Sequence, residues 1–499
     1  MICYNFAMER GRNSRMRWAA FWLLLLFPFL AVPSLRADTI VLKNGRRIVV
    51  DSATEEGEKV FYEGEGGRVS IPKSLVERIE KGGPTPPRRS SAPASPAAPA
   101  VDEQVAKELS GQVRMPQTDA EGIVRNGAID EERLQLLAGN AGKGDLERQN
   151  AVNAHLIAAS FEARQRRFAP ASRWAEEALR LSGRDLNALL LAADIDIVRQ
   201  QYAEALEHLL VAQSVSADSP VVLTLLGYAY YYLEGAEKAL RFWKRAQAIR
   251  PDAQLGQRIL RAESEAQVEG RFDQAESRNF ALSWEGTQVS TVFSREILNT
   301  LERQYQEVEA ALDYWPREPI AILLYTNQQF ADITRAPGWA GALNDGKIRV
   351  PVQGLTSMTP ELARVLKHEM VHSFVHRLAE GRCPTWLNEG LAQLESGQNS
   401  SRFGPALARL FAESRQIPLS QLERGFLQFD SPKVALAYAE SLAAAEMLRE
   451  RYGVYQLAQL LKTLGQGRTP AEALKEVLRM SYEDLEAELA QSLATRYGR

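Results

Sequence analysis

Apolar and polar residues alternate in the N-terminal part of the chain with the period of two that is typical of half-buried strands. The apolar runs lie at residues 39–42, 48–50, 60–62 and 69–71. Asn44-Gly45 and Gly66-Gly67 separate pairs of these runs, and such residues favour tight hairpin turns. We therefore expect four or five short strands that form a small all-β barrel over residues 38–81.

A helical pattern follows over residues 118–277, and it repeats every 34 residues. Small residues recur at three positions of the repeat: Ala159, Ala193 and Gly227; Ala171, Ala205 and Ala239; Ala178, Ala212 and Ala246. Small residues let paired helices approach closely, so the pattern predicts three stacked helix pairs over about residues 150–255. An Ala-rich helical spacer without true repeats is the alternative.

The pattern changes again over residues 278–499. Residues 319–325 form a continuous apolar run typical of a buried strand. Residues 280–284 and 347–352 are the other predicted strands, residues 294–314 form an amphipathic helix, and almost everything beyond Thr359 is helical. Pro351 indicates that its strand lies at a sheet edge. A sheet followed by helices indicates an α+β domain.

The first 37 residues have the features of a secretory signal peptide. Four arginines precede an apolar run at residues 18–32, and Ala37 offers a small residue at a cleavage point. The run contains Pro28 and is shorter than the roughly 20 apolar residues that span a bilayer. We expect export to a periplasmic or extracellular location; an uncleaved membrane anchor is the alternative, and Met8 or Met16 could be the operative start.

Residues 82–117 are rich in Pro, Ala and Ser, a composition that predicts an extended linker. A ligand for a Pro-binding partner is the alternative interpretation.

The overall composition narrows the partners. The chain has 499 residues, of which 45% are hydrophobic and 25% charged, which is ordinary for globular domains. A formal net charge of -3 gives no basic field for nucleic acid, and no stable membrane insertion is expected after signal cleavage. Two cysteines are too few for a disulfide framework.

The strongest chemical signal is His368-Glu369-Met370-Val371-His372, on the helix predicted at residues 359–378. Histidines at i and i+4 share one helix face, so both imidazoles can bind one zinc ion at about 2.0–2.1 Å, with Glu369 beside a water molecule on that ion.

A third ligand is expected from a second helix. Glu389 lies 17 residues after His372, within Trp386-Leu387-Asn388-Glu389-Gly390. Catalytic zinc takes three protein ligands and keeps a fourth position open, and two His with one Glu is a known set. The alternative HExxHxxGxxH pattern fails because the chain has Val375 and Leu378 where Gly and His would be needed.

Other candidates are weaker. A single helix cannot easily place His376 on the same ion, so we expect it to pack or to support a ligand. Cys383 is left out because a fourth protein ligand would close the site. Glu395 either orients a ligand histidine or is a solvated charge. His155 and His208 are expected to be packing or surface residues.

These motifs resemble known families. The HEMVH and WLNEG motifs resemble the gluzincin metallopeptidases, and the helical tail with residues 437–441 and 451–453 is similar to the peptidase MA-like domain. The 34-residue pattern resembles tetratricopeptide repeats, and residues 38–81 resemble small SH3-like modules of exported bacterial proteins. The expected architecture is therefore multidomain: a small β-barrel, a helical repeat domain and an α+β zincin-like metallopeptidase domain.

The resemblance implies roles for named residues. His368, His372 and Glu389 would bind Zn²⁺, and Glu369 would act as the general base. Tyr438 would donate a hydrogen bond to the oxyanion; a packed helix residue is the alternative, which the usual core role of aromatic residues at helical spacing favours. Related aminopeptidases carry a GxMEN loop that residues 338–345 lack, so an endopeptidase is favoured over an exopeptidase.

The implied function is hydrolysis of a peptide or protein substrate, with the repeats binding a protein partner. A scaffold with a structural, non-catalytic MA-like domain is the alternative. Residues 346–352 either pair with an extended substrate or pack as an ordinary sheet edge. We also expect the repeats to be dispensable for cleavage of short peptides, because repeat stacks are stabilised locally. The N-terminal module is either a docking module or a structural cap.

Overall fold

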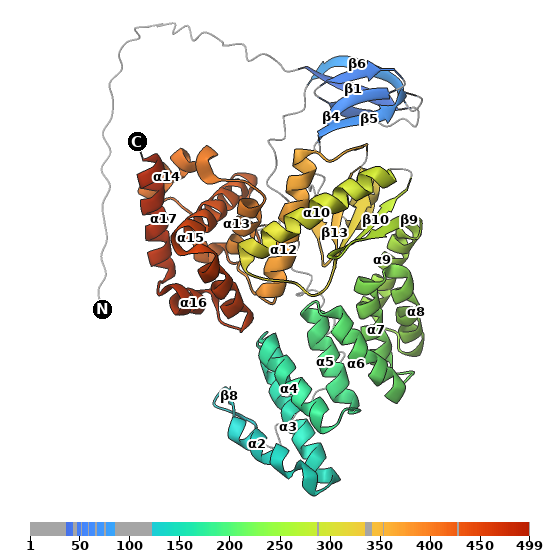
Figure 1. Cartoon of the computed structure of the whole chain (residues 1–499), viewed down its shortest axis with the longest axis vertical. Coiled ribbons are helices and arrows are strands. Elements are labelled where there is room, and N and C mark those ends of the chain that lie inside the picture. Colours follow the sequence, from blue (N-terminus) through green and yellow to red (C-terminus); the bar gives the residue numbers. More distant parts are fainter. Residues whose placement is uncertain are drawn as a thin grey trace, which may run out of the picture.

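The computed structural model describes residues 36–42, 47–50, 52–57, 59–64, 67–73, 76–84, 122–286, 289–334, 342–352, 354–426 and 429–498. Residues 1–35, which hold nearly all of the predicted signal peptide, and residues 85–121, which hold most of the predicted linker, lie outside them. The described parts are a small β module, a stack of helix pairs and a mixed sheet with a large helical region after it (Figure 1).

The β module consists of two antiparallel three-stranded sheets. One has the order β2-β1-β6 and the other β3-β4-β5. The strands are β1 (Arg36–Leu42), β2 (Arg47–Val50), β3 (Ala53–Glu56), β4 (Lys59–Gly64), β5 (Gly67–Pro72) and β6 (Val76–Pro84). Their shared core contains Ile40, Val50, Ala53 and Val60. Within the described residues, no strand pairing joins the two sheets. The predicted barrel is therefore observed only as two small sheets.

Two predicted boundaries of this module shift slightly. Arg36 pairs with Pro84 and Ala37 pairs with Gly83, so β1 begins before residue 38 and β6 continues past residue 81. The ends of these strands stabilise each other by pairing, which a composition-based boundary does not reveal.

The module contacts the C-terminal domain. The Ser70 backbone N–H donates to the Gly354 carbonyl across 3.3 Å. Tyr62 packs against the core of the C-terminal domain.

The next region contains antiparallel helix pairs. The elements are the short hairpin β7 (Val124–Arg125) and β8 (Ala128–Ile129), then α2 (Glu131–Asn140), α3 (Asp145–Arg164), α4 (Phe168–Leu181), α5 (Leu186–Val198), α6 (Tyr202–Val215), α7 (Pro220–Leu233), α8 (Ala236–Ile249) and α9 (Ala253–Glu269). The second helices of the pairs begin at Phe168, Tyr202 and Ala236, so the structural repeat is 34 residues long. The helical prediction is confirmed, and the tetratricopeptide assignment stays a prediction.

Small residues sit at the helix contacts. Ala171, Ala205 and Ala239 are fully buried. A Cβ at Gly227 would lie only 2.1 Å from Nε1 of Trp243, so this position of α7 excludes any side chain. These contacts explain the periodic small residues of the sequence.

The C-terminal domain is built on a five-stranded sheet of order β12-β13-β11-β10-β9. Its strands are β9 (Phe272–Glu276), β10 (Phe280–Glu285), β11 (Ile320–Tyr325), β12 (Leu343–Asn344) and β13 (Ile348–Pro351). The three central strands are parallel, and the two edge strands are antiparallel to their neighbours.

The expectation that the strand around Pro351 forms the sheet edge is wrong. The short strand β12 pairs with Ile348 and Arg349 and is itself the edge. Pro351 is accommodated because β12 pairs only with the first half of β13.

Helices cover the sheet and extend beyond it. They are α10 (Thr291–Leu312), α11 (Asn327–Thr334), α12 (Pro360–Leu378), α13 (Thr385–Glu395), α14 (Gly404–Ala412), α15 (Ser431–Gly465), α16 (Pro470–Ala473) and α17 (Tyr482–Tyr497). Tyr305 of α10 packs edge-on against Phe280 of the sheet and Phe374 of α12. Among the described residues, none of the helices combines the length and apolar character needed to cross a membrane.

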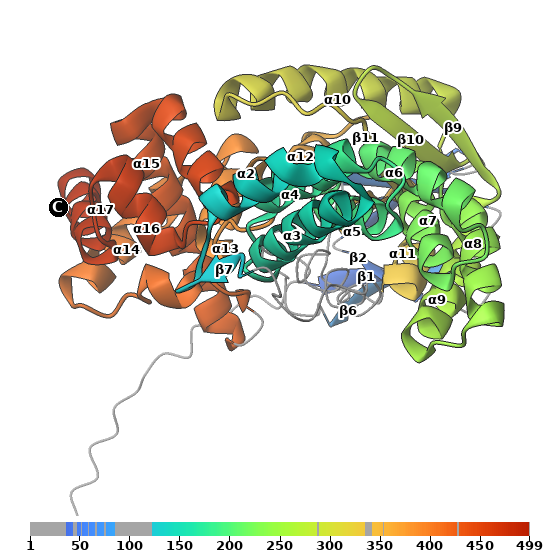
Figure 2. The ribbon, with the colours of Figure 1, turned by 90° about the horizontal axis from the view of Figure 1, so that it is seen from below.

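The stack of helix pairs runs alongside the C-terminal domain (Figure 2). The two regions have separate apolar cores, as expected, but buried polar contacts join them. Arg349 of β13 pairs with Glu269 of α9 at 3.2 Å, and Arg199 pairs with Glu380 at 3.0 Å. Removing the repeats would leave Arg349 without Glu269. The expectation that the repeats are dispensable for cleavage of short peptides stays a prediction.

Candidate metal centre

Helix α12 carries the two predicted histidine ligands. It begins with Thr359, whose side chain accepts a hydrogen bond from the Leu362 N–H, and Pro360 occupies the first turn. Its regular geometry places His368 and His372 one turn apart on one face, and both are buried. After a short loop, α13 begins at Thr385 and brings in Glu389, which is also fully buried.

The three side chains converge. Nε2 of His368 lies 3.1 Å from Nε2 of His372, and Oε2 of Glu389 lies 3.7 Å and 3.8 Å from these two atoms. Any point equidistant from the three atoms lies at least about 2.1 Å from each, so one ion near zinc–ligand bond length can contact all three. Within the described part of the chain, this is the one group of His, Cys, Asp and Glu with the geometry to hold a metal ion.

The electrostatic environment keeps both histidines neutral. Burial lowers the pKa of His368 well below its ordinary value, and the neighbouring His372 lowers it further. Burial lowers the pKa of His372 to about 4, against the opposing effect of its hydrogen bond to Asn388. Metal ligation requires a neutral imidazole, so these rings are in the right protonation state at neutral pH.

Asn388 is a supporting residue that the sequence reasoning missed. Its Oδ1 lies 2.9 Å from Nδ1 of His372, so the amide accepts the proton on Nδ1 and leaves Nε2 free to bind a metal. The signal available in the sequence was its place in the WLNEG motif, next to Glu389.

Gly390 is the second residue that was missed, and it explains how α13 reaches α15. A Cβ at this position would lie 2.2 Å from the Ser441 carbonyl oxygen and 2.8 Å from Cβ of Ala445. Glycine therefore allows the two helix backbones to touch. Gln393 reinforces the contact, because its Nε2 donates to the carbonyls of Glu389 and Tyr438.

This contact brings Tyr438 of α15 to the metal group. Its side chain is 2% exposed, and its hydroxyl forms no hydrogen bond with the described residues. Burial raises the pKa of the phenol, and the nearby carboxylates of Glu389 and Glu369 raise it further. A buried hydroxyl without a partner is uncommon and is available to donate to a ligand at this site.

Glu369 lies on α12 between the two histidines in sequence and is 3% exposed. Burial raises the pKa of its carboxyl to about 8. A carboxyl group with a pKa near neutrality is suited to accept a proton and return it.

The remaining candidates lie outside the group. Burial raises the pKa of the Cys383 thiol, which disfavours the thiolate form, and its Sγ faces the Pro384 carbonyl. Glu395 forms an ion pair with Arg449 of α15. His376 is not one of the residues that converge. Nδ1 of His155 donates to the Ala151 carbonyl, and His208 pairs with Glu176, so both have structural roles in the helix pairs.

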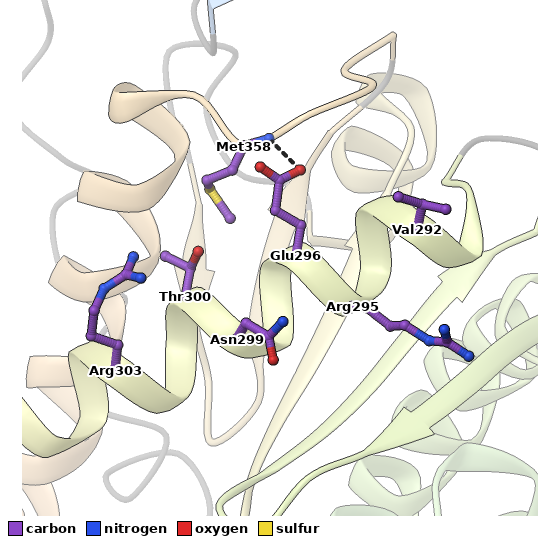
Figure 3. A pocket seen from close by; sticks show the side chains of 7 residues that line it. All are labelled: Val292, Arg295, Glu296, Asn299, Thr300, Arg303 and Met358. Carbon is purple, nitrogen blue, oxygen red and sulfur yellow. Dashed lines mark hydrogen bonds between the residues drawn. The ribbon is translucent and has the colours of Figure 1, made fainter.

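A pocket of about 620 Å³ lies away from the metal group, on the exposed side of α10 (Figure 3). Seven residues line it: Val292, Arg295, Glu296, Asn299, Thr300, Arg303 and Met358. The Met358 N–H donates to Glu296 across 3.1 Å. None of the three converging side chains lines the pocket, so we assign it no role in metal binding.

Comparison with known proteins adds one match. No curated protein matches the chain. A family model described as the Peptidase MA superfamily matches residues 306–495. The matched segment begins within α10, excludes the β module and the helix pairs, and contains His368, Glu369, His372, Glu389 and Tyr438. The C-terminal domain is thus similar to the Peptidase MA superfamily over the segment that forms the candidate metal centre.

Proposed function

We propose that this chain is an exported zinc metallopeptidase of the gluzincin type. The observation that carries the proposal is the convergence of one oxygen and two nitrogen ligand atoms from His368, His372 and Glu389. Glu369 lies on α12 with the two histidines, while Glu389 comes from α13. The match to the Peptidase MA superfamily supports the reaction class.

The residues have separate roles in peptide hydrolysis. Zinc, when held by the three ligands, supplies a Lewis acid and lowers the pKa of a water molecule to about 7. Glu369 takes a proton from the attacking water and passes it to the nitrogen of the leaving amine. The Tyr438 hydroxyl, which has no hydrogen-bond partner among the described residues, donates to the developing oxyanion.

The substrate is proposed to be an internal segment of a peptide or protein. No GxMEN loop is present to bind a free amine. The carboxylates of Glu369 and Glu389 are committed to the water molecule and the metal. Residues 346–352 are proposed to offer backbone pairing to an extended substrate, since β12 pairs only with Ile348 and Arg349 of this segment.

The helix pairs are proposed to bind a protein partner or substrate, since stacked helix pairs offer a concave surface. The N-terminal module is proposed to dock on the C-terminal domain, as its contact between Ser70 and Gly354 suggests. A non-catalytic scaffold is the rival function, and measurement of peptidase activity separates the two.

Metal analysis of the wild type and two variants tests the proposal. The wild type is expected to hold about one zinc per chain, because three ligands define one site. His368→Ala should lose the metal. His376→Ala is the matched control, because it removes a histidine one turn away on the same helix, outside the group, and should retain zinc. Full zinc retention by His368→Ala would overturn the ligand assignment.

Activity separates the enzyme from the scaffold. Glu369→Gln should keep the zinc and lose about 10²- to 10⁴-fold in rate, since it removes the general base. Zinc-loaded wild type that cleaves no member of a broad peptide library would favour the scaffold.

Acetylated peptides test the specificity. Blocking the N-terminus should change kcat/KM little and should leave internal fragments as the first products. Stepwise release of single N-terminal residues, abolished by acetylation, would instead show an aminopeptidase with the same zinc site.

A further inference from the structure

The hairpin formed by β12 and β13 contacts the candidate metal helix directly. Nδ2 of Asn344 donates to the backbone carbonyl of Glu369 at 2.8 Å and to Oγ of Ser373 at 2.7 Å. Oδ1 of the same Asn344 accepts from the Gly346 N–H at 3.2 Å. One side chain thus ties the edge hairpin to the turn of α12 that carries Glu369.

The opposite side of the hairpin is held by the helix pairs. Arg349 is only 1% exposed, and its Nη2 donates to the hydroxyl of Tyr231 at 2.9 Å. Tyr231 in turn donates to Oε2 of Glu265 at 2.6 Å. Tyr231 lies on α7 and Glu265 on α9, so one arginine of the sheet binds two repeat helices.

Further bonds complete the environment of Arg349. Nη1 donates to Glu269 at 3.2 Å and to the Tyr325 hydroxyl at 2.6 Å, and Nε donates to Asp345 at 3.1 Å. A buried guanidinium is tolerated only where its donors are satisfied. The position of the hairpin relative to the repeats is therefore closely specified.

The turn of the hairpin also sits against repeat aromatics. The rings of Tyr202 and Tyr232 stack with centroids 4.3 Å apart. Gly346 has φ +92°, and a Cβ there would lie 2.8 Å from Cε1 of Tyr232. Lys347 lies over the ring of Tyr231 at 4.1 Å. Packing and polar contacts thus place the hairpin in one position.

We propose that Arg349 and Tyr231 are positioning residues, through which the helix pairs fix the β12–β13 hairpin and, through Asn344, the turn of α12 that bears Glu369. The inference rests on the proposed function, because it deepens the account of the same site. On this proposal the helix pairs belong to the catalytic unit, and they can also bind a partner.

The test uses the full chain loaded with zinc. Tyr231→Phe keeps the aromatic ring and removes only the hydroxyl that links Arg349 to Glu265. It should lower kcat about 10-fold at unchanged zinc content, because small displacements of catalytic groups cost up to about 10²-fold. Tyr230→Phe is the matched control on the same helix: its ring stacks on Phe242, away from the hairpin, and kcat should not change.

A double variant tests the route of the effect. Asn344→Ala breaks the link to Glu369, so adding Tyr231→Phe to it should cause no further loss of kcat. Independent losses that multiply would overturn the proposal, as would an unchanged kcat in Tyr231→Phe. If Tyr231→Phe does not fold, Glu265→Gln, which keeps the acceptor and removes the charge, replaces it in the same cycle.

Hydrogen exchange provides a readout that does not depend on peptidase activity. Tyr231→Phe should speed exchange at the backbone amides of residues 343–351 and 369–373, and Tyr230→Phe should not. Equal exchange in both variants would overturn the positioning role even in an inactive protein. An exchange difference in a chain that hydrolyses nothing would instead reject the proposed function and leave the coupling standing.

Discussion

Oδ1 of Asn388 accepts the proton of Nδ1 in His372 across 2.9 Å, and Asn388 directly precedes Glu389 in sequence. One turn of α13 therefore carries both Glu389, a candidate anionic ligand, and the residue that orients a candidate histidine ligand from α12. The relationship couples the two helices at the metal group, and it leads to the first prediction.

Asn388→Ala should weaken zinc binding about 10- to 100-fold, because the loss of a hydrogen bond to a ligand histidine leaves its tautomer and orientation unfixed. Competition with a chromophoric chelator measures the affinity. Asn388→Asp retains an acceptor and should keep most of the affinity. An affinity in Asn388→Ala equal to that of the wild type would contradict the role.

Tyr438→Phe should retain zinc and lose about 10²- to 10³-fold in kcat, which is the usual effect of removing one oxyanion donor. Steady-state kinetics on an internally quenched peptide measure it. Tyr452→Phe is the control, because Tyr452 lies on the same helix and its hydroxyl bonds to Glu488 instead. Equal kcat in the two variants would assign Tyr438 to packing.

Gly390→Ala should destabilise the domain by about 1–3 kcal/mol, since the new methyl group meets the Ser441 carbonyl and forces α13 away from α15. Zinc affinity should fall with it, because Glu389 moves with the helix. Urea unfolding and chelator competition measure the two effects. Gly425→Ala is the control, because the added Cβ would meet no atom within 4 Å in the part of the chain that the structure describes. Similar stability in the two variants would show that the helix contact is not tight.

Asp194, on α5, should make the stability of the helix pairs fall as the pH rises. Burial raises its pKa from 3.8 to about 7, so between these values the folded state holds a proton that the unfolded state has released. The stabilisation is full below about pH 4 and is lost as the pH rises through 7. Asp196 has a similarly raised pKa and contributes in the same direction.

Asp194→Asn should therefore reduce the decline in stability between pH 5 and pH 8, as measured by urea unfolding at several pH values. A matched substitution at the exposed Asp218 should leave the decline unchanged. An identical pH dependence in wild type and Asp194→Asn would contradict the assignment.

Local chemistry made much of this protein predictable from its sequence. His368 and His372 share a face because any regular helix places residues i and i+4 together, and Thr359 with Pro360 marks where that helix begins. The 34-residue helix pairs follow from small residues at fixed intervals, which determine how closely neighbouring helices pack. The strands of the N-terminal module likewise follow from the alternation of apolar and polar residues with a period of two.

Other features depend on contacts between residues far apart in the chain. The alternation of apolar and polar residues does not determine which strands pair. For this reason the structure has two sheets where a barrel was predicted. The strand that contains Pro351 is likewise an inner strand beside β12. The partner of Glu395 lies 54 positions away at Arg449, and no local pattern identifies it. The approach of Gly390 to Ser441, which brings Tyr438 to Glu389, is a packing event of the same kind.

The sequence alone was sufficient to predict the types of the candidate ligands and the helices that carry them. Helical periodicity and side-chain chemistry act over only a few residues, so they can be recognised locally. The contacts between the helix pairs and the C-terminal domain are visible only in the tertiary structure. Arg349 is an ordinary strand residue in the sequence, and its burial among Tyr231, Glu265 and Glu269 arises only when two regions about 80 to 120 positions apart come together.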